Sequence, residues 1–137
     1  MFLLKSNAKV VQNFDLAKRK QINLLFQEKL LIFATRYSVN MLVLKDCINK
    51  LTAFKEESGK QFGITKIGIF GSVARQENTE DSDIDIVVEV EQPTLSLMYE
   101  LRERLKALFK CNVDLVRFRP SLRPLFKSNI INEAIYV

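Results

Sequence analysis

Three short runs of β-branched and aromatic residues mark the C-terminal part of this 137-residue chain, at residues 65–70, 84–90 and 112–117. Runs of this length and composition are typical of buried strands. Because helical patterns precede, separate and follow them, the sequence predicts a small mixed β-sheet covered by helices, of the α/β class in its α+β form. The chain is long enough for one modest core and too short for two ordinary domains.

Two helices are expected before the first strand. Apolar residues at three- and four-residue spacing predict one helix over residues 14–34, with a broad and irregular apolar stripe, and a second over 42–61. A neutral, self-contained pattern begins at Met41, which is therefore a candidate for the true start of translation. We accordingly expect a basic helical extension over residues 1–40 and a domain over 41–137.

Three further helices complete the predicted order. A short helix would follow Gly71, and an amphipathic helix would cover residues 94–109. Pro120 and Pro124 suit the first turn of a terminal helix, because proline needs no backbone donor there. The predicted order is helix, strand, short helix, strand, helix, strand, helix, after the N-terminal extension.

The formal net charge of +5 belongs entirely to the N-terminal segment. Residues 1–40 hold seven Lys or Arg against two acidic residues, whereas residues 41–137 hold fourteen of each sign. A neutral remainder argues against a dedicated nucleic-acid-binding surface. The basic cluster at residues 18–20 fits a phosphate or partner contact, but so short a run is more often a solvated helix face.

Histidine is absent from the chain. This excludes a Ser/His/Asp triad, a Cys/His dyad, histidine-ligated zinc and imidazole-dependent ribonucleases. Cys47 and Cys111 form no metal or disulfide motif, so a reducing cytoplasm is the expected location. We find no signal peptide and no membrane span, since the apolar run 22–34 is interrupted by the polar residues 27–29.

Two aspartates, Asp83 and Asp85, stand two residues apart at the start of the second predicted strand. Side chains alternate along a strand, so both carboxylates project to one side while Ile84 and Ile86 enter the core. Adjacent like charges need a cation, and Mg²⁺ prefers oxygen ligands together with substrate phosphates and water. Asp114, on a neighbouring strand, would add a third carboxylate, and three acids can bind two metal ions for nucleotidyl transfer without histidine.

An EF-hand calcium loop starting at Asp81 would also contain these acids, but it does not fit the sequence. Ile86 occupies its sixth position, where glycine is required, and Gln92 its twelfth, where glutamate is required. A simple charged turn over residues 80–85 is the remaining alternative. Two carboxylates that continue into an apolar strand would be costly without a cationic partner, which favours the metal site.

A phosphate site is expected just before these acids. Gly71 and Ser72 end a strand where a short helix begins, so backbone N–H groups and the Ser72 hydroxyl can point at phosphate. Gly71 would allow close approach. Arg75, about one helical turn later, would add a cation on the same side. Taken singly, each of these residues is more simply explained as a turn or a surface cation.

The combined pattern resembles the nucleotidyltransferase fold of the DNA polymerase beta superfamily. It consists of Gly-Ser at 71–72, the ten-residue spacer 73–82, the Asp83-x-Asp85 pair and the later Asp114. The Gly-Ser-x-Ala-Arg and Ser-Asp-Ile-Asp forms, the small size and the ending Asn-Glu-Ala-Ile-Tyr-Val are more narrowly similar to the minimal, antitoxin-type nucleotidyltransferases. The resemblance covers residues 41–137.

The resemblance implies roles for six residues: metal binding and catalysis by Asp83, Asp85 and Asp114, and nucleotide binding by Gly71, Ser72 and Arg75. It implies Mg²⁺, with two ions, as the cofactor and ATP as the donor. Members of the family that this chain resembles are encoded beside a HEPN-domain ribonuclease toxin. Some of them neutralise the toxin by transferring AMP to one of its tyrosines. Lacking histidine, this chain is not that ribonuclease.

Three functions are compatible with the sequence. The leading one is a Mg²⁺-dependent nucleotidyltransferase that transfers AMP to a tyrosine hydroxyl of a HEPN-type partner and so acts as an antitoxin. A second is transfer to a small molecule such as an aminoglycoside, although relatives of that kind usually carry an added acceptor-binding domain. A third is an antitoxin that acts by binding alone, with an idle site.

Overall fold

The computed structural model describes residues 2–137, and describes side chains from residue 15 onward. Its contacts divide the chain into two compact units, Met1–Ser38 and Val39–Val137. The second unit contains the sheet and every residue predicted above to carry chemistry. Our expectation of a separate extension ending at residue 40 stays a prediction.

A single helix, α1, spans Phe2–Phe62. The expectation of two helices, over 14–34 and 42–61, was wrong: the residues between them include no glycine or proline to interrupt the backbone hydrogen bonds. Instead, the hydroxyls of Thr35 and Ser38 donate to backbone carbonyls one turn earlier, at 2.8 and 3.0 Å. Within residues 2–137, neither α1 nor any other helix combines the length and apolar character needed to cross a membrane.

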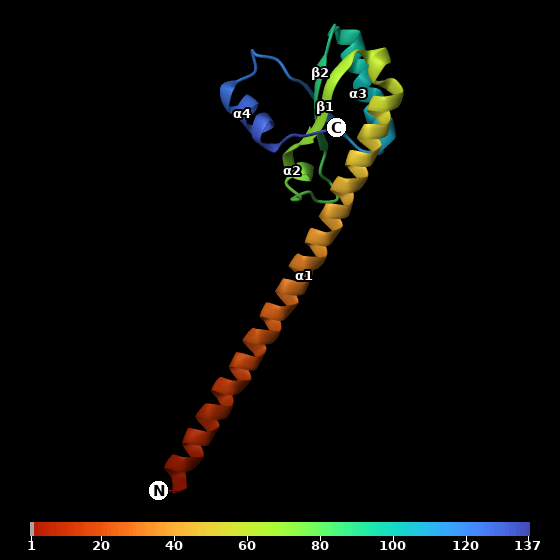
Figure 1. Cartoon of the computed structure of the whole chain (residues 1–137). Coiled ribbons are helices and arrows are strands. Elements are labelled where there is room, and N and C mark those ends of the chain that lie inside the picture. Colours follow the sequence, from red (N-terminus) through yellow and green to blue (C-terminus); the bar gives the residue numbers. More distant parts are fainter. Residues whose placement is uncertain (1) are drawn as a thin grey trace. The chain divides into compact units, whose positions relative to one another are not determined.

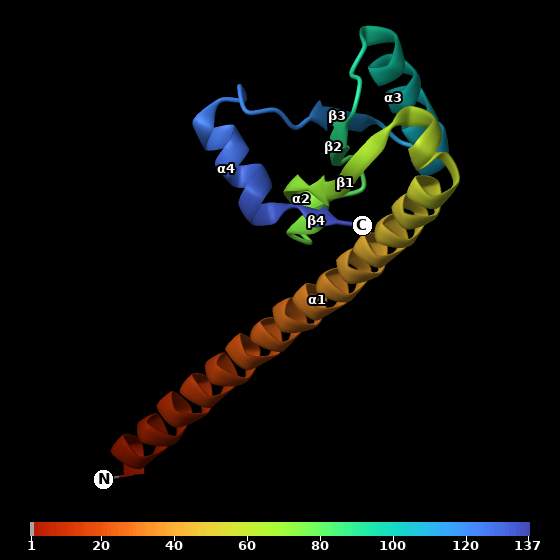
Figure 2. The same ribbon diagram turned by 45° about the horizontal axis from the view of Figure 1, so that its top comes forward.

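Four strands form one mixed sheet in the order β3-β2-β1-β4. Figure 1 labels its two central strands, β2 and β1, and Figure 2 labels all four. They are β1 (Ile64–Phe70), β2 (Ile84–Val90), β3 (Val113–Arg117) and β4 (Ile135–Tyr136). β2 and β3 run parallel, whereas β1 runs antiparallel to both β2 and β4. The predicted mixed sheet with covering helices is confirmed. β4 was not predicted, because two residues are too few to show an alternating pattern.

The other helices are α2 (Gly71–Ala74), α3 (Leu95–Phe109) and α4 (Pro124–Glu133). The hydroxyl of Thr94 caps α3 by accepting a hydrogen bond from the Leu97 amide. Of the two prolines near the predicted terminal helix, Pro124 begins it. The positions of these helices agree closely with the sequence prediction.

Helices lie on both faces of the sheet of the Val39–Val137 unit (Figure 2), and each face has a hydrophobic core. On one face, α3 and the part of α1 within this unit pack against the strands through fully or nearly fully buried side chains: Cys47, Leu51, Leu101, Leu105, Ile67, Ile69 and Ile86. On the other face, Ile130 of α4 packs against Phe70 and Val87. Side-chain alternation along β1 and β2 thus supplies both cores.

Candidate functional site

The predicted carboxylates lie where β2 and β3 begin. Asp85 of β2 pairs in register with Asp114 of β3 in the parallel ladder, and Asp83 directly precedes β2. The flanking residues Ile84 and Val113 belong to the core on the α3 face. Alternation therefore directs Asp85 and Asp114 to the opposite face, which α4 covers.

Electrostatics link these groups. Burial raises the pKa of the half-buried Asp85 carboxyl above its usual range, and the charges of Asp114 and Asp83 raise it further. Arg75 acts in the opposite direction, lowering this pKa, and Glu133 again raises it. Asp85 thus lies in an excess of negative charge, which a bound cation would relieve.

Three carboxylates in one neighbourhood do not by themselves make a closed metal site. Across the part of the chain that the structure describes, no three acidic or cysteine side chains converge closely enough to hold an ion. Mg²⁺ is commonly bound through one or two carboxylates, with substrate phosphates and water completing its shell. The donor chemistry of Asp83, Asp85 and Asp114 therefore fits Mg²⁺ bound jointly with a triphosphate, not an ion held by protein alone.

Gly71 lies against the Asp85 side chain. Its φ angle is +70°, a left-handed conformation, and a Cβ placed on it would lie 2.2 Å from Asp85 Oδ2 and 2.9 Å from Asp85 Cγ. Phe70, the residue before it, pairs with Asp85 across β1 and β2. The Gly-Ser turn and the Asp-x-Asp pair, separated by ten residues in the sequence, are thus in direct contact, and only glycine leaves room for it.

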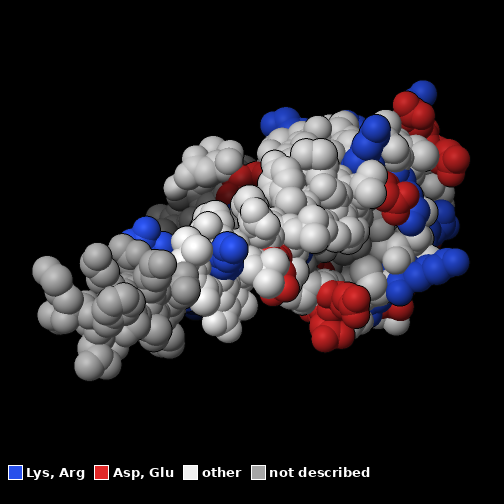
Figure 3. All heavy atoms as spheres, turned by 90° about the horizontal axis from the view of Figure 1, so that it is seen from below, with Lys and Arg blue, Asp and Glu red and all other residues white. Residues whose placement is uncertain are grey.

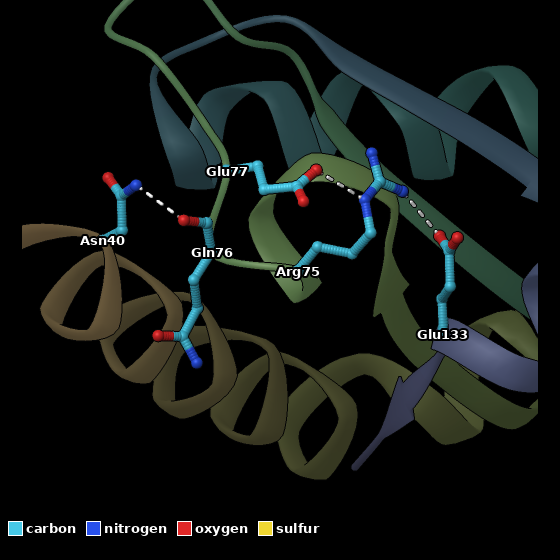
Figure 4. A network of polar contacts seen from close by, with 5 residues as sticks. All are labelled: Asn40, Arg75, Gln76, Glu77 and Glu133. Carbon is cyan, nitrogen blue, oxygen red and sulfur yellow. Dashed lines mark hydrogen bonds and ion pairs between the residues drawn. The ribbon is translucent and has the colours of Figure 1, made fainter. Parts of the chain in front are cut away.

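Arg75 is held by two carboxylates, as Figure 4 shows. Its Nε lies 2.9 Å from Glu77 Oε2, and its Nη1 lies 2.8 Å from Glu133 Oε2. The hydrogen bond to Glu77, together with that to Glu133, raises the pKa of the guanidinium above its ordinary value. The residue predicted as a phosphate ligand is therefore engaged in ion pairs, with 43% of its side chain exposed.

Glu133 was not identified by sequence reasoning. It ends α4, and its side chain is only 25% exposed beside Arg75. The next residues form β4, which pairs with Gly68 and Ile69 of β1 and so fixes the end of α4 near the site. The only sequence signal was that Glu133 lies in the family-like ending, and nothing in the spacing showed which groups it would meet.

The loop after α2 is anchored to α1. The buried Asn40 donates a hydrogen bond from Nδ2 to the backbone carbonyl of Gln76, at 2.7 Å (Figure 4). Gln76 has a φ of 59°, so a side-chain hydrogen bond supports a backbone conformation that non-glycine residues rarely adopt. Asn40 thus contributes to the Val39–Val137 unit, although the sequence placed it in the N-terminal extension.

Surface charge is mixed. Figure 3 shows Lys and Arg side chains interspersed with Asp and Glu over the Val39–Val137 unit on the face drawn. This fits the equal numbers of basic and acidic residues counted over residues 41–137. The face in view has no continuous basic groove of the kind that tracks a nucleic-acid strand.

Comparisons with known proteins agree with this geometry. A family model described as the nucleotidyltransferase domain matches residues 49–137. The protein adenylyltransferase MntA of Thermococcus cleftensis is 43% identical over 98 residues, which cover 71% of this chain and 98% of that protein. A solved structure described provisionally as a minimal nucleotidyltransferase is 30% identical, with a TM-score of 0.54, over 70% of this chain and 93% of its own.

A second solved structure supports the fold. It is a crystal structure of a toxin-antitoxin with AMP-PNP, 23% identical with a TM-score of 0.53, over 64% of this chain and 69% of that chain. The family match covers the sheet and the whole acidic site, and the predicted fold is confirmed. The chain therefore belongs to the nucleotidyltransferase domain family.

Proposed function

We propose that this nucleotidyltransferase transfers AMP from ATP to a tyrosine hydroxyl of a HEPN-type toxin encoded by an adjacent gene, and so acts as its antitoxin. The observation that carries the proposal is the 43% identity to a protein adenylyltransferase over nearly the whole of that relative. The contact between Gly71 and Asp85, with Asp114 in register beside it, supports an intact site.

The metal-binding residues would be Asp83, Asp85 and Asp114. Mg²⁺, when bound, would neutralise phosphate charge and lower the pKa of the attacking hydroxyl. The acceptor oxygen forms a bond to the α-phosphorus of ATP, the bond to the bridging oxygen breaks, and pyrophosphate leaves with its electron pair. The hydroxyl proton is lost to solvent or to a nearby carboxylate. This chemistry needs no histidine.

The remaining residues would bind and orient the donor. Gly71 and Ser72 would contact the triphosphate at the end of β1, immediately beside Asp85. Arg75 would bind phosphate oxygens, and Glu133 would act as a positioning residue, because its 2.8 Å ion pair directs the guanidinium from the α4 side. When ATP binds, its phosphate oxygens can replace a carboxylate as the partner of Arg75. The cost in free energy is small, because both partners are oxyanions.

The proposed nucleotide donor and the proposed protein partner are inferred from related proteins. The solved toxin-antitoxin that shares this fold contains AMP-PNP, an ATP analogue, which supports ATP as the donor here. That structure also pairs an antitoxin with a toxin, which supports a protein acceptor over a small molecule. The cytoplasm is our proposed location, since both Cys47 and Cys111 are free thiols.

The test combines the purified chain, the product of the adjacent gene, Mg²⁺ and either ATP or GTP, and measures intact mass. We expect addition of AMP to the partner with ATP, and none with Asp83→Asn/Asp85→Asn. Asp81→Asn is the matched control, because Asp81 is an exposed carboxylate in the preceding loop that we assign no role. Equal circular dichroism spectra would show that all variants fold.

Two outcomes would contradict the proposal. Undiminished transfer by the double variant would refute the assigned metal-binding residues. A stable complex that silences the toxin without nucleotide attachment, equally well with the double variant, would establish an antitoxin that acts by binding alone.

A further inference from the structure

The helix of the Met1–Ser38 unit exposes an unusual amount of apolar surface. Every large apolar side chain between residues 16 and 37 is 48–68% exposed. At on the order of 100 Å² each, these side chains present roughly 1,000 Å² summed over all sides of the helix. A single apolar patch of about 300–600 Å² on a monomer often marks an interaction site, so one continuous face of this helix is large enough to contact another protein surface.

The exposed apolar residues lie on all sides of α1. One face, which we call the aromatic stripe, consists of Ile22, Phe26, Leu30, Phe33 and Tyr37, at successive spacings of four, four, three and four residues. At 3.6 residues per turn this spacing keeps all five side chains on one side of the helix. The opposite face carries other leucines and is interrupted by a glutamate at residue 28. The aromatic stripe is therefore the more continuous contact surface.

Four of the five residues of the aromatic stripe are placed symmetrically along the helix. Leu30 and Phe33 lie at equal distances on either side of a midpoint between residues 31 and 32, and so do Phe26 and Tyr37. If a second copy packs antiparallel about that midpoint, Leu30 meets Phe33 of the second copy and Phe26 meets Tyr37 of the second copy. A twofold axis requires such self-complementarity, in which each contact occurs twice.

The charges favour the same orientation. In the antiparallel register Lys29 faces an alanine and Arg36 faces a glutamine, at positions 34 and 27 of the second copy, and within the basic cluster at 18–20 only Lys18 faces a like charge, a lysine at position 45. A parallel pair would instead place Lys29 beside Lys29, Arg36 beside Arg36, and the basic cluster at 18–20 beside itself. Like charges at facing positions destabilise helix pairing.

A membrane surface fits this helix poorly. Interfacial helices collect their charges on one side, opposite a single apolar face. Here the consecutive cations Lys18, Arg19 and Lys20 point in three directions around the helix, because successive residues are turned by about 100°.

We propose that residues 26–37 of α1, which contain four of the five residues of the aromatic stripe, pair antiparallel with the same segment of a second copy, so that the chain is a homodimer. The stripe supplies roughly 500 Å² per copy, and flanking side chains add to it, against about 800 Å² per partner in ordinary specific interfaces. This proposal is independent of the proposed function, because it concerns a segment outside the matched nucleotidyltransferase domain.

The first test measures the molar mass of the full chain by sedimentation and light scattering over a range of concentrations. We expect a dimer. Leu30→Glu should raise the dissociation constant by on the order of a hundredfold or more, since each dimer would bury two unpartnered carboxylates. Leu24→Glu is the matched control: Leu24 is equally exposed, at 58% against 56% for Leu30, but lies on the opposite face, so the dimer should persist.

The second test determines orientation by cross-linking. Phe26→Cys and Tyr37→Cys are made separately in a Cys111→Ser background, mixed and oxidised, while the buried Cys47 stays unreactive. Antiparallel pairing predicts a disulfide between the two different variants, because only facing positions come within bonding range. A monomeric full chain, a dimer unaffected by Leu30→Glu, or a preference for Phe26→Cys with itself would each overturn the proposal.

Discussion

Replacing Gly71 by alanine should disturb both stability and catalysis. With φ at +70°, alanine would be held in the left-handed region, which costs roughly 1–2 kcal/mol for a residue with a Cβ. The new methyl group would also lie 2.2 Å from Asp85 Oδ2 and 2.9 Å from Asp85 Cγ, so the Asp85 carboxylate must turn away. A side chain driven off its rotamer costs about 0.5–1.5 kcal/mol.

These costs add to about 1.5–3.5 kcal/mol of unfolding free energy for Gly71→Ala. In a unit of this size each kcal/mol lowers the melting temperature by about 4–8 °C, so thermal unfolding followed by circular dichroism should show a drop of about 6–28 °C. Displacement of Asp85 predicts a larger effect on catalysis: AMP transfer should fall nearly as far as in Asp85→Asn, measured at a temperature where the variant is folded.

Gly59→Ala is the matched control, a glycine in a regular helix. There the added Cβ meets only the flexible Lys55 side chain, at 3.4 Å, and Gly59 lies within α1. Alanine should therefore stabilise the protein by about 0.5–1 kcal/mol through helix propensity and leave transfer unchanged. A Gly71→Ala variant with wild-type melting and full transfer would refute the close contact between Gly71 and Asp85.

Two further predictions test the ionisable groups. Glu133→Gln should raise KM for ATP by no more than about fivefold and affect kcat less, because a partly exposed ion pair contributes about 1 kcal/mol at most. Glu77→Gln, whose carboxylate is 65% exposed, should change KM less. Equal effects of the two substitutions would contradict a special role for Glu133. Burial raises the pKa of the Cys47 thiol to about 11, from 9.0. The unfolded chain therefore ionises this thiol first, so stability present below pH 9 should fall by up to about 1.4 kcal/mol per pH unit towards pH 11. Denaturant titrations should show this fall, and Cys47→Ala should reduce it.

The fold was predictable where its signals were local. Strand β2 follows from a run rich in β-branched residues, in which every second residue from Ile84 onward is apolar, and its observed span, Ile84–Val90, equals the predicted one. The continuity of α1 was missed because apolar periodicity shifts near residue 40, whereas helix continuation depends on the absence of a breaker. β4 forms because its backbone lies close to Gly68 of β1, where a Cβ would lie only 2.8 Å from Ile135 O. This contact arises from tertiary packing, which no local sequence pattern shows.

The candidate site, like the fold, was predictable from the sequence only where its signals are local. That Asp83 and Asp85 should share one side is a prediction from the two-residue period of a strand, which the sequence contains. The sequence placed Asp114 on a neighbouring strand as a third carboxylate, but its register with Asp85 depends on how β2 and β3 align, which the sequence pattern does not specify. Glu133 reaches the site because α4 and β4 fold back along β1, so no local pattern could connect it with Arg75.

Catalysis and assembly should separate cleanly, because they involve different segments of the chain. The family match begins at residue 49 and contains every proposed catalytic group, whereas the aromatic stripe lies wholly before residue 38. Leu30→Glu should therefore abolish the dimer and leave the rate of AMP transfer per chain unchanged, and Asp83→Asn/Asp85→Asn should abolish transfer and leave the dimer intact. Loss of transfer in Leu30→Glu, recovered at protein concentrations that restore the dimer, would instead mean that the second copy contributes to the active site. The two variants measured side by side, for molar mass and for AMP attachment, distinguish these arrangements, since independent segments predict that each variant changes one readout only.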